Sequence, residues 1–166
     1  MFKSKNITTI LARAGVIAAL YTATSLVTAP IASGAIQVRL SEALTLLPLI
    51  FPEAIPALFI GCALSNLITG CMPLDIILGS IITLVAAALT YAVGRIIKNT
   101  ALKITVGGLF PVLLNALSLP LIWVYCYGAI EYIYVLQVAF LLVGQTLSVY
   151  AVGAPLYLVL RKKFKT

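Results

Sequence analysis

Seven polar residues lie within or next to long apolar segments of this chain, where hydrogen-bonding groups are costly unless they are paired. They are Arg39, Glu42, Asn66, Asp75, Asn115, Gln137 and Gln145. Carboxylates accept hydrogen bonds or balance a cation, amides donate and accept, and a guanidinium only donates. Such groups can recognise a small polar solute. The sequence has no His, no phosphate-binding loop and no metal-binding cysteine spacing, so we expect neither catalysis nor a metal or cofactor.

The composition indicates that these residues belong to a membrane protein. Hydrophobic residues make up 63% of the 166 positions and charged residues 9%, against roughly 25% charged residues in soluble domains. Ten of the eleven basic residues form three clusters, which are Lys3, Lys5 and Arg13; Arg95, Lys98 and Lys103; and Arg161, Lys162, Lys163 and Lys165. Because short cytoplasmic segments retain Lys and Arg, the clusters mark the cytoplasmic face. Orientation and anionic lipid then explain the net charge of +7, and no nucleic acid is expected.

Charge placement also decides how many helices position the polar residues. The apolar blocks are 7–28, 42–69, 74–93, 104–127 and 132–160. The second block contains Pro48, Pro52 and Pro56, and proline disfavours a continuous helix. A break at Pro52 gives segments 41–51 and 53–69, and only the resulting six helices place all three basic clusters on one side.

The sequence therefore predicts an all-α integral membrane protein with a single domain over 1–166. We expect a six-transmembrane-helix bundle in the cell membrane, with both termini cytoplasmic. The second helix has only about eleven residues and cannot cross a core of ~30 Å at 1.5 Å per residue. A short helix beside a loop indicates a cavity within the bundle.

The polar residues admit two interpretations. Arg39 and Glu42 can pair at the membrane interface and cap the short helix together with Ser41, or they can reach into an outward-facing cavity. Asp75 can cap a helix, and a lone Asn or Gln often bonds a neighbouring helix. Because several of these residues map to the outer half of the membrane, where a solute would enter, we predict a substrate site. Its residues are Arg39, Glu42, Asn66, Asp75, Asn115 and Gln145.

Small residues recur at four-residue spacing in the first segment. Ala14 is followed by Ala18, and Gly15 is followed by Ala19. Small residues one turn apart let another helix approach closely in lipid. The partner can be another protein or another helix of the same chain.

Four stretches resemble the QueT family of queuosine-precursor transporters. They are residues 36–48 (IQVRLSEALTLLP), 51–56 (FPEAIP), 61–66 (GCALSN) and 74–80 (LDIILGS), and the resemblance covers most of the chain. It implies a substrate-binding (S) component of an energy-coupling factor (ECF) transporter. Such a six-helix protein captures a vitamin-like molecule outside the cell and docks on a transmembrane coupling subunit that carries two ATPases. The A-x-x-x-A pattern that forms this contact in S components is matched by Ala14 and Ala18, with Gly15 and Ala19 as a second register.

The implied ligand is a 7-deazaguanine, such as 7-aminomethyl-7-deazaguanine or queuine. A carboxylate can accept the N1–H and 2-amino hydrogen bonds of a guanine-like edge. Glu42 is the first candidate for this role and Asp75 the second, and either can pair with an aminomethyl cation. Asn66 and Asn115 would read the carbonyl or ring nitrogens, and Arg39 would orient Glu42 or cover the mouth. The alternatives are an S component for another vitamin-like molecule, such as riboflavin, and a membrane scaffold subunit that transports nothing.

Overall fold

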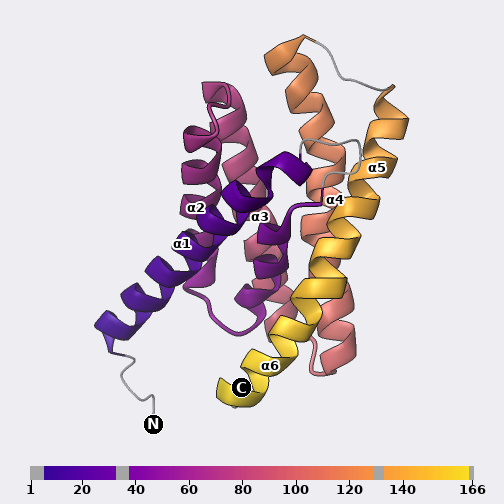
Figure 1. Ribbon diagram of the computed structural model, residues 1–166. Coiled ribbons are helices and arrows are strands. Elements are labelled where there is room, and N and C mark those ends of the chain that lie inside the picture. The colour runs from indigo at the N-terminus through magenta and orange to yellow at the C-terminus, as the bar shows by residue number, and fades with distance from the viewer. Residues whose placement is uncertain (1–5, 33–37, 129–132, 165–166) are drawn as a thin grey trace.

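The computed structural model describes residues 6–32, 38–128 and 133–164, and every regular element in these ranges is a helix. In chain order (Figure 1) they are α1 (Ile7–Ala32), η1 (Leu40–Leu49), α2 (Ala54–Ile68), α3 (Pro73–Ile96), α4 (Thr100–Tyr127), α5 (Tyr134–Thr146), η2 (Leu147–Gly153) and α6 (Ala154–Phe164). The last three follow one another without a break and form one long helical span, Tyr134–Phe164. The described part of the chain thus contains six helical segments, and the predicted all-α bundle is confirmed.

Four of the segments are long and apolar enough to cross a membrane. They are Ile7–Pro30, Pro73–Ile96, Thr100–Tyr127 and Tyr134–Phe164. The other two, η1 and α2, are shorter apolar helices. Because η1 ends at Leu49 and α2 begins at Ala54, the predicted break at Pro52 and the short second helix are both confirmed.

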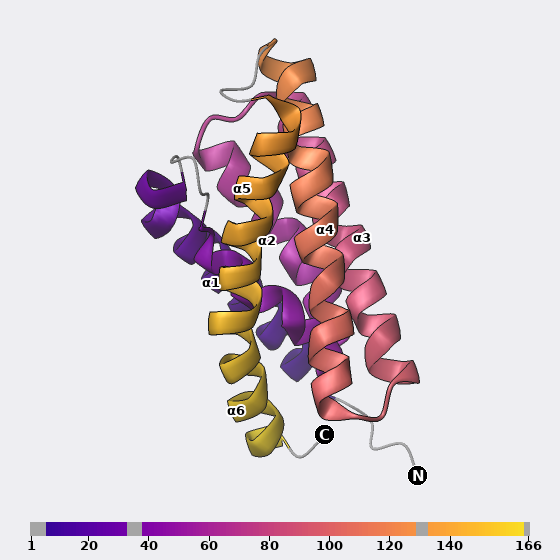
Figure 2. The same ribbon diagram turned by 90° about the vertical axis from the view of Figure 1, so that its right-hand side faces the viewer.

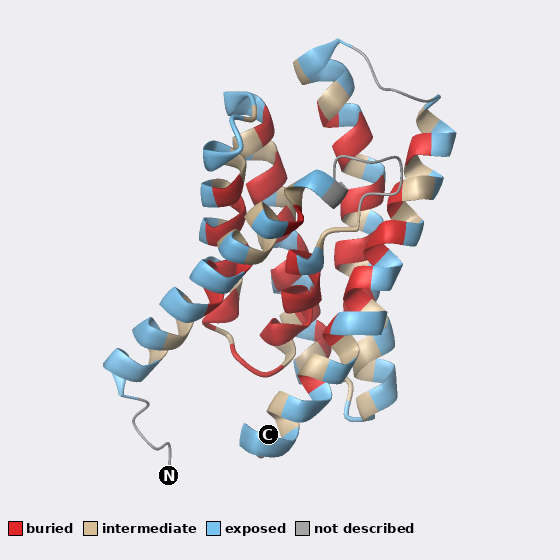
Figure 3. Ribbon diagram, in the orientation of Figure 1, coloured by how far each residue is buried: buried red, intermediate tan, exposed pale blue. Residues whose placement is uncertain are grey.

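The short second helix is a 3-10 helix that lies inside the bundle. All residues from Ser41 to Pro48 are buried, and Figure 3 shows this segment at the centre of the molecule. Most residues of the segment are apolar, which suits such a position, and Ser41, Glu42 and Thr45 are its polar residues. At about 2.0 Å per residue, its ten residues extend roughly 20 Å. Leu46 and Leu47 belong to the same buried cluster as Tyr21 of α1 and Leu58 of α2, so η1 shares one hydrophobic core with α1 and α2.

The last span contains a π-helical segment, η2, that packs directly against η1. A Cβ atom added to Gly153 would lie 2.7 Å from the carbonyl oxygen of Ala43, so only a glycine allows this backbone approach. On the α4 side, the Tyr150 hydroxyl donates a hydrogen bond to the carbonyl of Thr105 at 2.6 Å. The Tyr150 ring occupies the space that a side chain at position 108 would fill, which Gly108 leaves open. The last span is therefore fixed between η1 and α4.

One end of the bundle carries the basic clusters. The start of α1, the connection from α3 to α4 and the end of α6 lie together there (Figures 1 and 2). We call this the basic end, and the described basic residues near it are Arg13, Arg95, Lys98, Lys103, Arg161, Lys162 and Lys163. Lys3, Lys5 and Lys165 lie outside the described residues. The six-helix interpretation requires this common location.

Arg13 connects three segments at the basic end. Its Nη1 lies 3.4 Å from Oε1 of Glu53, whose side chain is buried. Its guanidinium lies 5.1 Å from the centre of the Phe51 ring and 5.2 Å from that of Phe164, and the two rings meet edge to face. Cation–π contacts and the ion pair thus hold α1 against the turn before α2 and against α6.

Candidate functional site

Glu42 lies at the centre of a buried hydrogen-bond group that joins three helices. Only 1% of its surface is exposed. Its Oε1 accepts a hydrogen bond from the Tyr21 hydroxyl of α1 at 2.7 Å, and its Oε2 accepts one from Nδ2 of Asn115 in α4 at 3.0 Å. Because a carboxylate has about four lone-pair positions, Glu42 can accept further hydrogen bonds.

Of the two interpretations of Arg39 and Glu42, the structure does not show the interfacial cap of η1. Among the described residues the one ion pair is that of Arg13 with Glu53, so Arg39 and Glu42 do not form an ion pair. The physical reason is that Glu42 points into the bundle, where Tyr21 and Asn115 supply its hydrogen bonds. Ser41 does not cap the helix either, since its hydroxyl has no partner in the described part of the chain.

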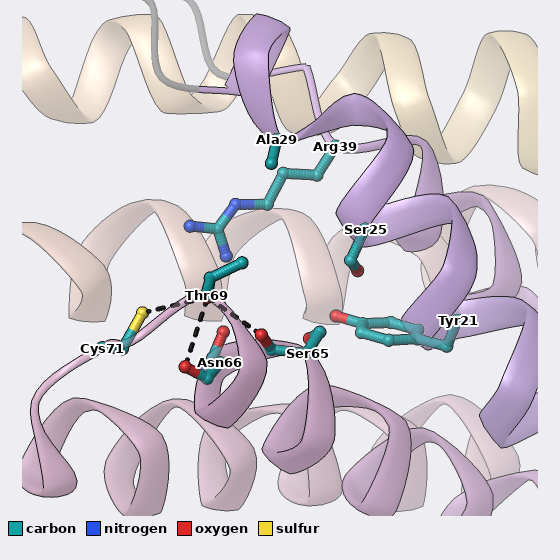
Figure 4. A pocket seen from close by; sticks show the side chains of 8 residues that line it. All are labelled: Tyr21, Ser25, Ala29, Arg39, Ser65, Asn66, Thr69 and Cys71. Carbon is teal, nitrogen blue, oxygen red and sulfur yellow. Dashed lines mark hydrogen bonds between the residues drawn. The ribbon is translucent and has the colours of Figure 1, made fainter.

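A cavity of about 200 Å³ opens beside this group between α1, α2 and the residues before η1. It is lined by Tyr21, Ser25, Ala29, Arg39, Ser65, Asn66, Thr69 and Cys71 (Figure 4). A smaller void of about 20 Å³ adjoins it and reaches Glu42, Asp75 and Asn115. Tyr21, Arg39 and Asn66 line both spaces. The buried carboxylate is therefore at the inner side of a polar cavity.

Arg39 supplies a cation to the cavity. Figure 4 shows its guanidinium extending across the space toward the end of α2, where Thr69 lies. It forms no hydrogen bond or ion pair with any described residue. Its five N–H donors are thus available to an acceptor group on a bound molecule.

Asp75 closes the side of the site that faces the α2–α3 connection. The carboxylate is buried, and its Oδ2 accepts a hydrogen bond from the Tyr127 hydroxyl at 3.1 Å. The same hydroxyl accepts a hydrogen bond from the backbone N–H of Met72 at 3.2 Å. These two hydrogen bonds connect the end of α4 to the start of α3. Gly79 leaves room here, since a Cβ on it would lie 3.3 Å from Nδ2 of Asn66 and 3.8 Å from Oδ1 of Asp75.

The structure brings together five of the six residues expected to bind a substrate. Arg39, Glu42, Asn66, Asp75 and Asn115 all line the smaller void. Gln145 lines neither space, although it is completely buried. Asn115 fits both interpretations of a polar residue in a span, which are bonding to another helix and contact with a ligand. It donates a hydrogen bond to η1 and also lines the void.

Sequence reasoning missed the hydroxyl groups of the cavity wall. Tyr21 and Ser25 are four residues apart on α1, and Ser65 and Thr69 are four residues apart on α2. Four-residue spacing puts side chains on the same face of a helix, so two facing hydroxyl stripes were available as a signal. The signal is weak by itself, because Ser and Thr in apolar helices often bond a carbonyl of the preceding turn, as Thr69 does.

The two small-residue registers of α1 face different surroundings. Ala18 is buried against α2, where a Cβ on Gly61 would lie 3.0 Å from the Ala18 carbonyl oxygen, and Ala14 is half-buried beside the same core. Gly15 and Ala19 are exposed, and nothing lies within 4 Å of a Cβ placed on Gly15. The outward register is therefore the one open to a partner.

Apolar spans around a polar, partly enclosed cavity define a membrane-embedded helical protein that can hold a small solute. No group of residues that could bind a metal is present among those described. The chain belongs to the QueT transporter family, whose family model matches residues 11–162. This confirms the resemblance seen in the sequence and gives the protein a role in transport. Comparisons with curated proteins and with solved structures gave no match.

Proposed function

We propose that the protein is the S component of an ECF transporter and captures a queuosine precursor for ATP-driven uptake. The ligand would be a 7-deazaguanine, such as 7-aminomethyl-7-deazaguanine or queuine. One observation carries the proposal: the buried carboxylate of Glu42 adjoins a polar cavity that also holds the guanidinium of Arg39, which forms no ion pair with a described residue. Membership of the QueT family supports the transport role.

The charges of the cavity suit such a ligand. Glu42 has lone pairs left for the N1–H and 2-amino donors of a guanine-like edge. Asp75 accepts one hydrogen bond at Oδ2 and can balance the charge of an aminomethyl group. Asn66 and Asn115 supply amide groups for the carbonyl and ring nitrogen, and Arg39 covers the mouth.

The size of the cavity favours a small solute over a larger vitamin. Pockets for drug-sized molecules measure roughly 300–1,000 Å³, whereas the cavity here measures about 200 Å³. A compact fused heterocycle fits this range better than riboflavin, which carries three rings and a long polyhydroxyl chain. The size therefore supports the deazaguanine over riboflavin.

The proposed partners follow from what the chain lacks in its own sequence. It contains no phosphate-binding loop, so ATP hydrolysis would come from two ATPase subunits that are joined to it by the coupling subunit. The small residues of α1 would form the contact with this subunit. Anionic membrane lipid would surround the basic end.

Titration calorimetry of the purified protein tests the proposal directly. Saturable binding of 7-aminomethyl-7-deazaguanine is expected, with riboflavin as the comparison ligand. Saturable binding of riboflavin alone would identify an S component of different specificity. If neither molecule and no other vitamin-like solute binds, the scaffold alternative replaces the proposal.

The proposed orientation in the cell membrane has the basic end in the cytoplasm and the cavity outside. In a variant without the native cysteines, a thiol introduced at Pro73 should react with an impermeant reagent added to intact cells. A thiol introduced at Asn99, in the connection between α3 and α4, should react only after the cells are opened. Labelling of Asn99→Cys from outside would reverse the orientation.

A further inference from the structure

The inner face of α5 contains buried amide atoms without hydrogen-bond partners. Gln145 is completely buried, and neither its Oε1 nor its Nε2 has a partner in the described part of the chain. Oε1 of Gln137, two turns earlier, also has no partner among the described residues. Native proteins retain few such groups, and each one calls for an explanation. An apolar side chain of similar length would avoid the cost, so the amide of Gln145 points to a missing partner.

The packing of α4 against α5 shows which part of α4 lies level with Gln145. The two helices run antiparallel (Figure 2). Leu141 lies in one buried cluster with Ala116 and Leu119, whereas Tyr150 reaches Gly108 and Thr105 further along α4. Gln145 falls between these two contacts, and so it is level with residues 112–115 of α4. That turn holds Asn115, the residue that donates a hydrogen bond to Glu42.

Gln145 also adjoins an irregular part of its helix. The π-helical segment η2 begins two residues later, at Leu147, and packs against η1. Single π-turns inside α-helices are frequent at functional sites. A void of about 20 Å³ lies beside Asn115, and a ligand that widens it toward α5 would reach the Gln145 amide.

We propose that Gln145 is a specificity-determining residue of the ligand site, at the side opposite the cavity mouth. This inference rests on the proposed function. An amide offers a donor and an acceptor side by side, and therefore recognises a neighbouring acceptor and donor. In 7-aminomethyl-7-deazaguanine that pair is the 6-carbonyl and the amino group attached through C7. Nε2 donates to the carbonyl, Oε1 accepts from the amino group, and Glu42 remains free for the N1–H and 2-amino edge.

The test compares Gln145→Met with Gln137→Met, which removes the other partly unpaired amide of α5. Two measurements are made on each purified protein: the melting temperature without ligand, and the affinity for 7-aminomethyl-7-deazaguanine and for its 7-cyano analogue, which has no donor at that position. We expect Gln145→Met to melt no lower than the wild type, because it removes an unsatisfied group. Its affinity for the aminomethyl ligand should fall about tenfold or more, and its preference over the cyano analogue should disappear. Gln137→Met should keep the wild-type affinity for the aminomethyl ligand and the preference over the cyano analogue.

Each other outcome has a distinct meaning. Unchanged affinity and preference in Gln145→Met would overturn this inference alone, since the wild type still binds. A lower melting temperature with an equal loss for both ligands would show that Gln145 only supports the fold, and would overturn it too. A wild type that binds neither deazaguanine would overturn the proposed function together with this inference. If Gln145→Met does not fold, Gln145→Asn, which withdraws the amide by one methylene, is measured in the same way.

Discussion

Glu42→Gln is expected to weaken the binding of a 7-deazaguanine by about tenfold or more. The substitution turns one acceptor into a donor that faces the donors of a guanine-like edge. A hydrogen bond to a charged group contributes roughly 1.5–3 kcal/mol, and a mismatch leaves buried groups unpaired. A loss of about 1.4 kcal/mol already corresponds to a factor of about ten. An analogue with an oxygen in place of the 2-amino group should be rejected for the same reason.

Binding must be expressed per folded molecule, because Glu42 also joins Tyr21 and Asn115. Titration calorimetry gives the affinity, and circular dichroism gives the folded fraction. Glu53→Gln is the matched control, since Glu53 is also buried but pairs with Arg13 at the basic end. It should lower stability and leave affinity intact. Unchanged affinity in folded Glu42→Gln would remove Glu42 from the site and make Asp75 the first candidate.

Gly15→Trp or Ala19→Trp should abolish ATP-driven uptake and leave ligand binding intact. Both positions are exposed on α1, and a bulky side chain there would hold a partner helix several ångströms away from a surface that needs small residues. Uptake is measured in proteoliposomes that contain the coupling subunit and the ATPases. Liposomes with this chain alone should bind the ligand without accumulating it.

The choice of positions follows from the two registers of α1. Ala14→Trp and Ala18→Trp also remove a small residue from the A-x-x-x-A pattern, but Ala18 is buried against Gly61, so its replacement would disturb the fold as well. Val27→Trp is the control, because Val27 is a highly exposed residue near the other end of the same helix. Normal uptake and normal co-purification of Gly15→Trp and Ala19→Trp would place the docking surface elsewhere.

The architecture was predictable because it depends on local properties of the sequence. Hydropathy marks each span by itself, and proline at position 52 interrupts a helix wherever it occurs. The positions of Arg95 and Lys98 between two apolar blocks distinguish six segments from five. None of these inferences needs knowledge of which helices are neighbours.

The partners within the site were not predictable in the same way. Glu42 bonds residues that are 21 and 73 positions away in the chain, and no local pattern encodes such a contact. Pairing with Arg39 was one of two interpretations because the two residues are close in sequence, but η1 turns Glu42 inward. The burial of η1 from Ser41 to Pro48 also becomes visible only when the bundle is assembled.

The position of Glu42 has a mechanical consequence. Tyr21 and Asn115 reach its two oxygens from α1 and α4, and α1 otherwise packs mainly on α2 and η1. A ligand that competes for Oε1 would release one fastening of α1, the least buried of the four candidate spans. We expect occupancy to alter the mobility of α1, which hydrogen exchange of its backbone amides would register. The helix that responds to the ligand would then be the same helix that presents Gly15 and Ala19 to a partner. The ligand-bound and ligand-free proteins would therefore differ at the surface that contacts the partner.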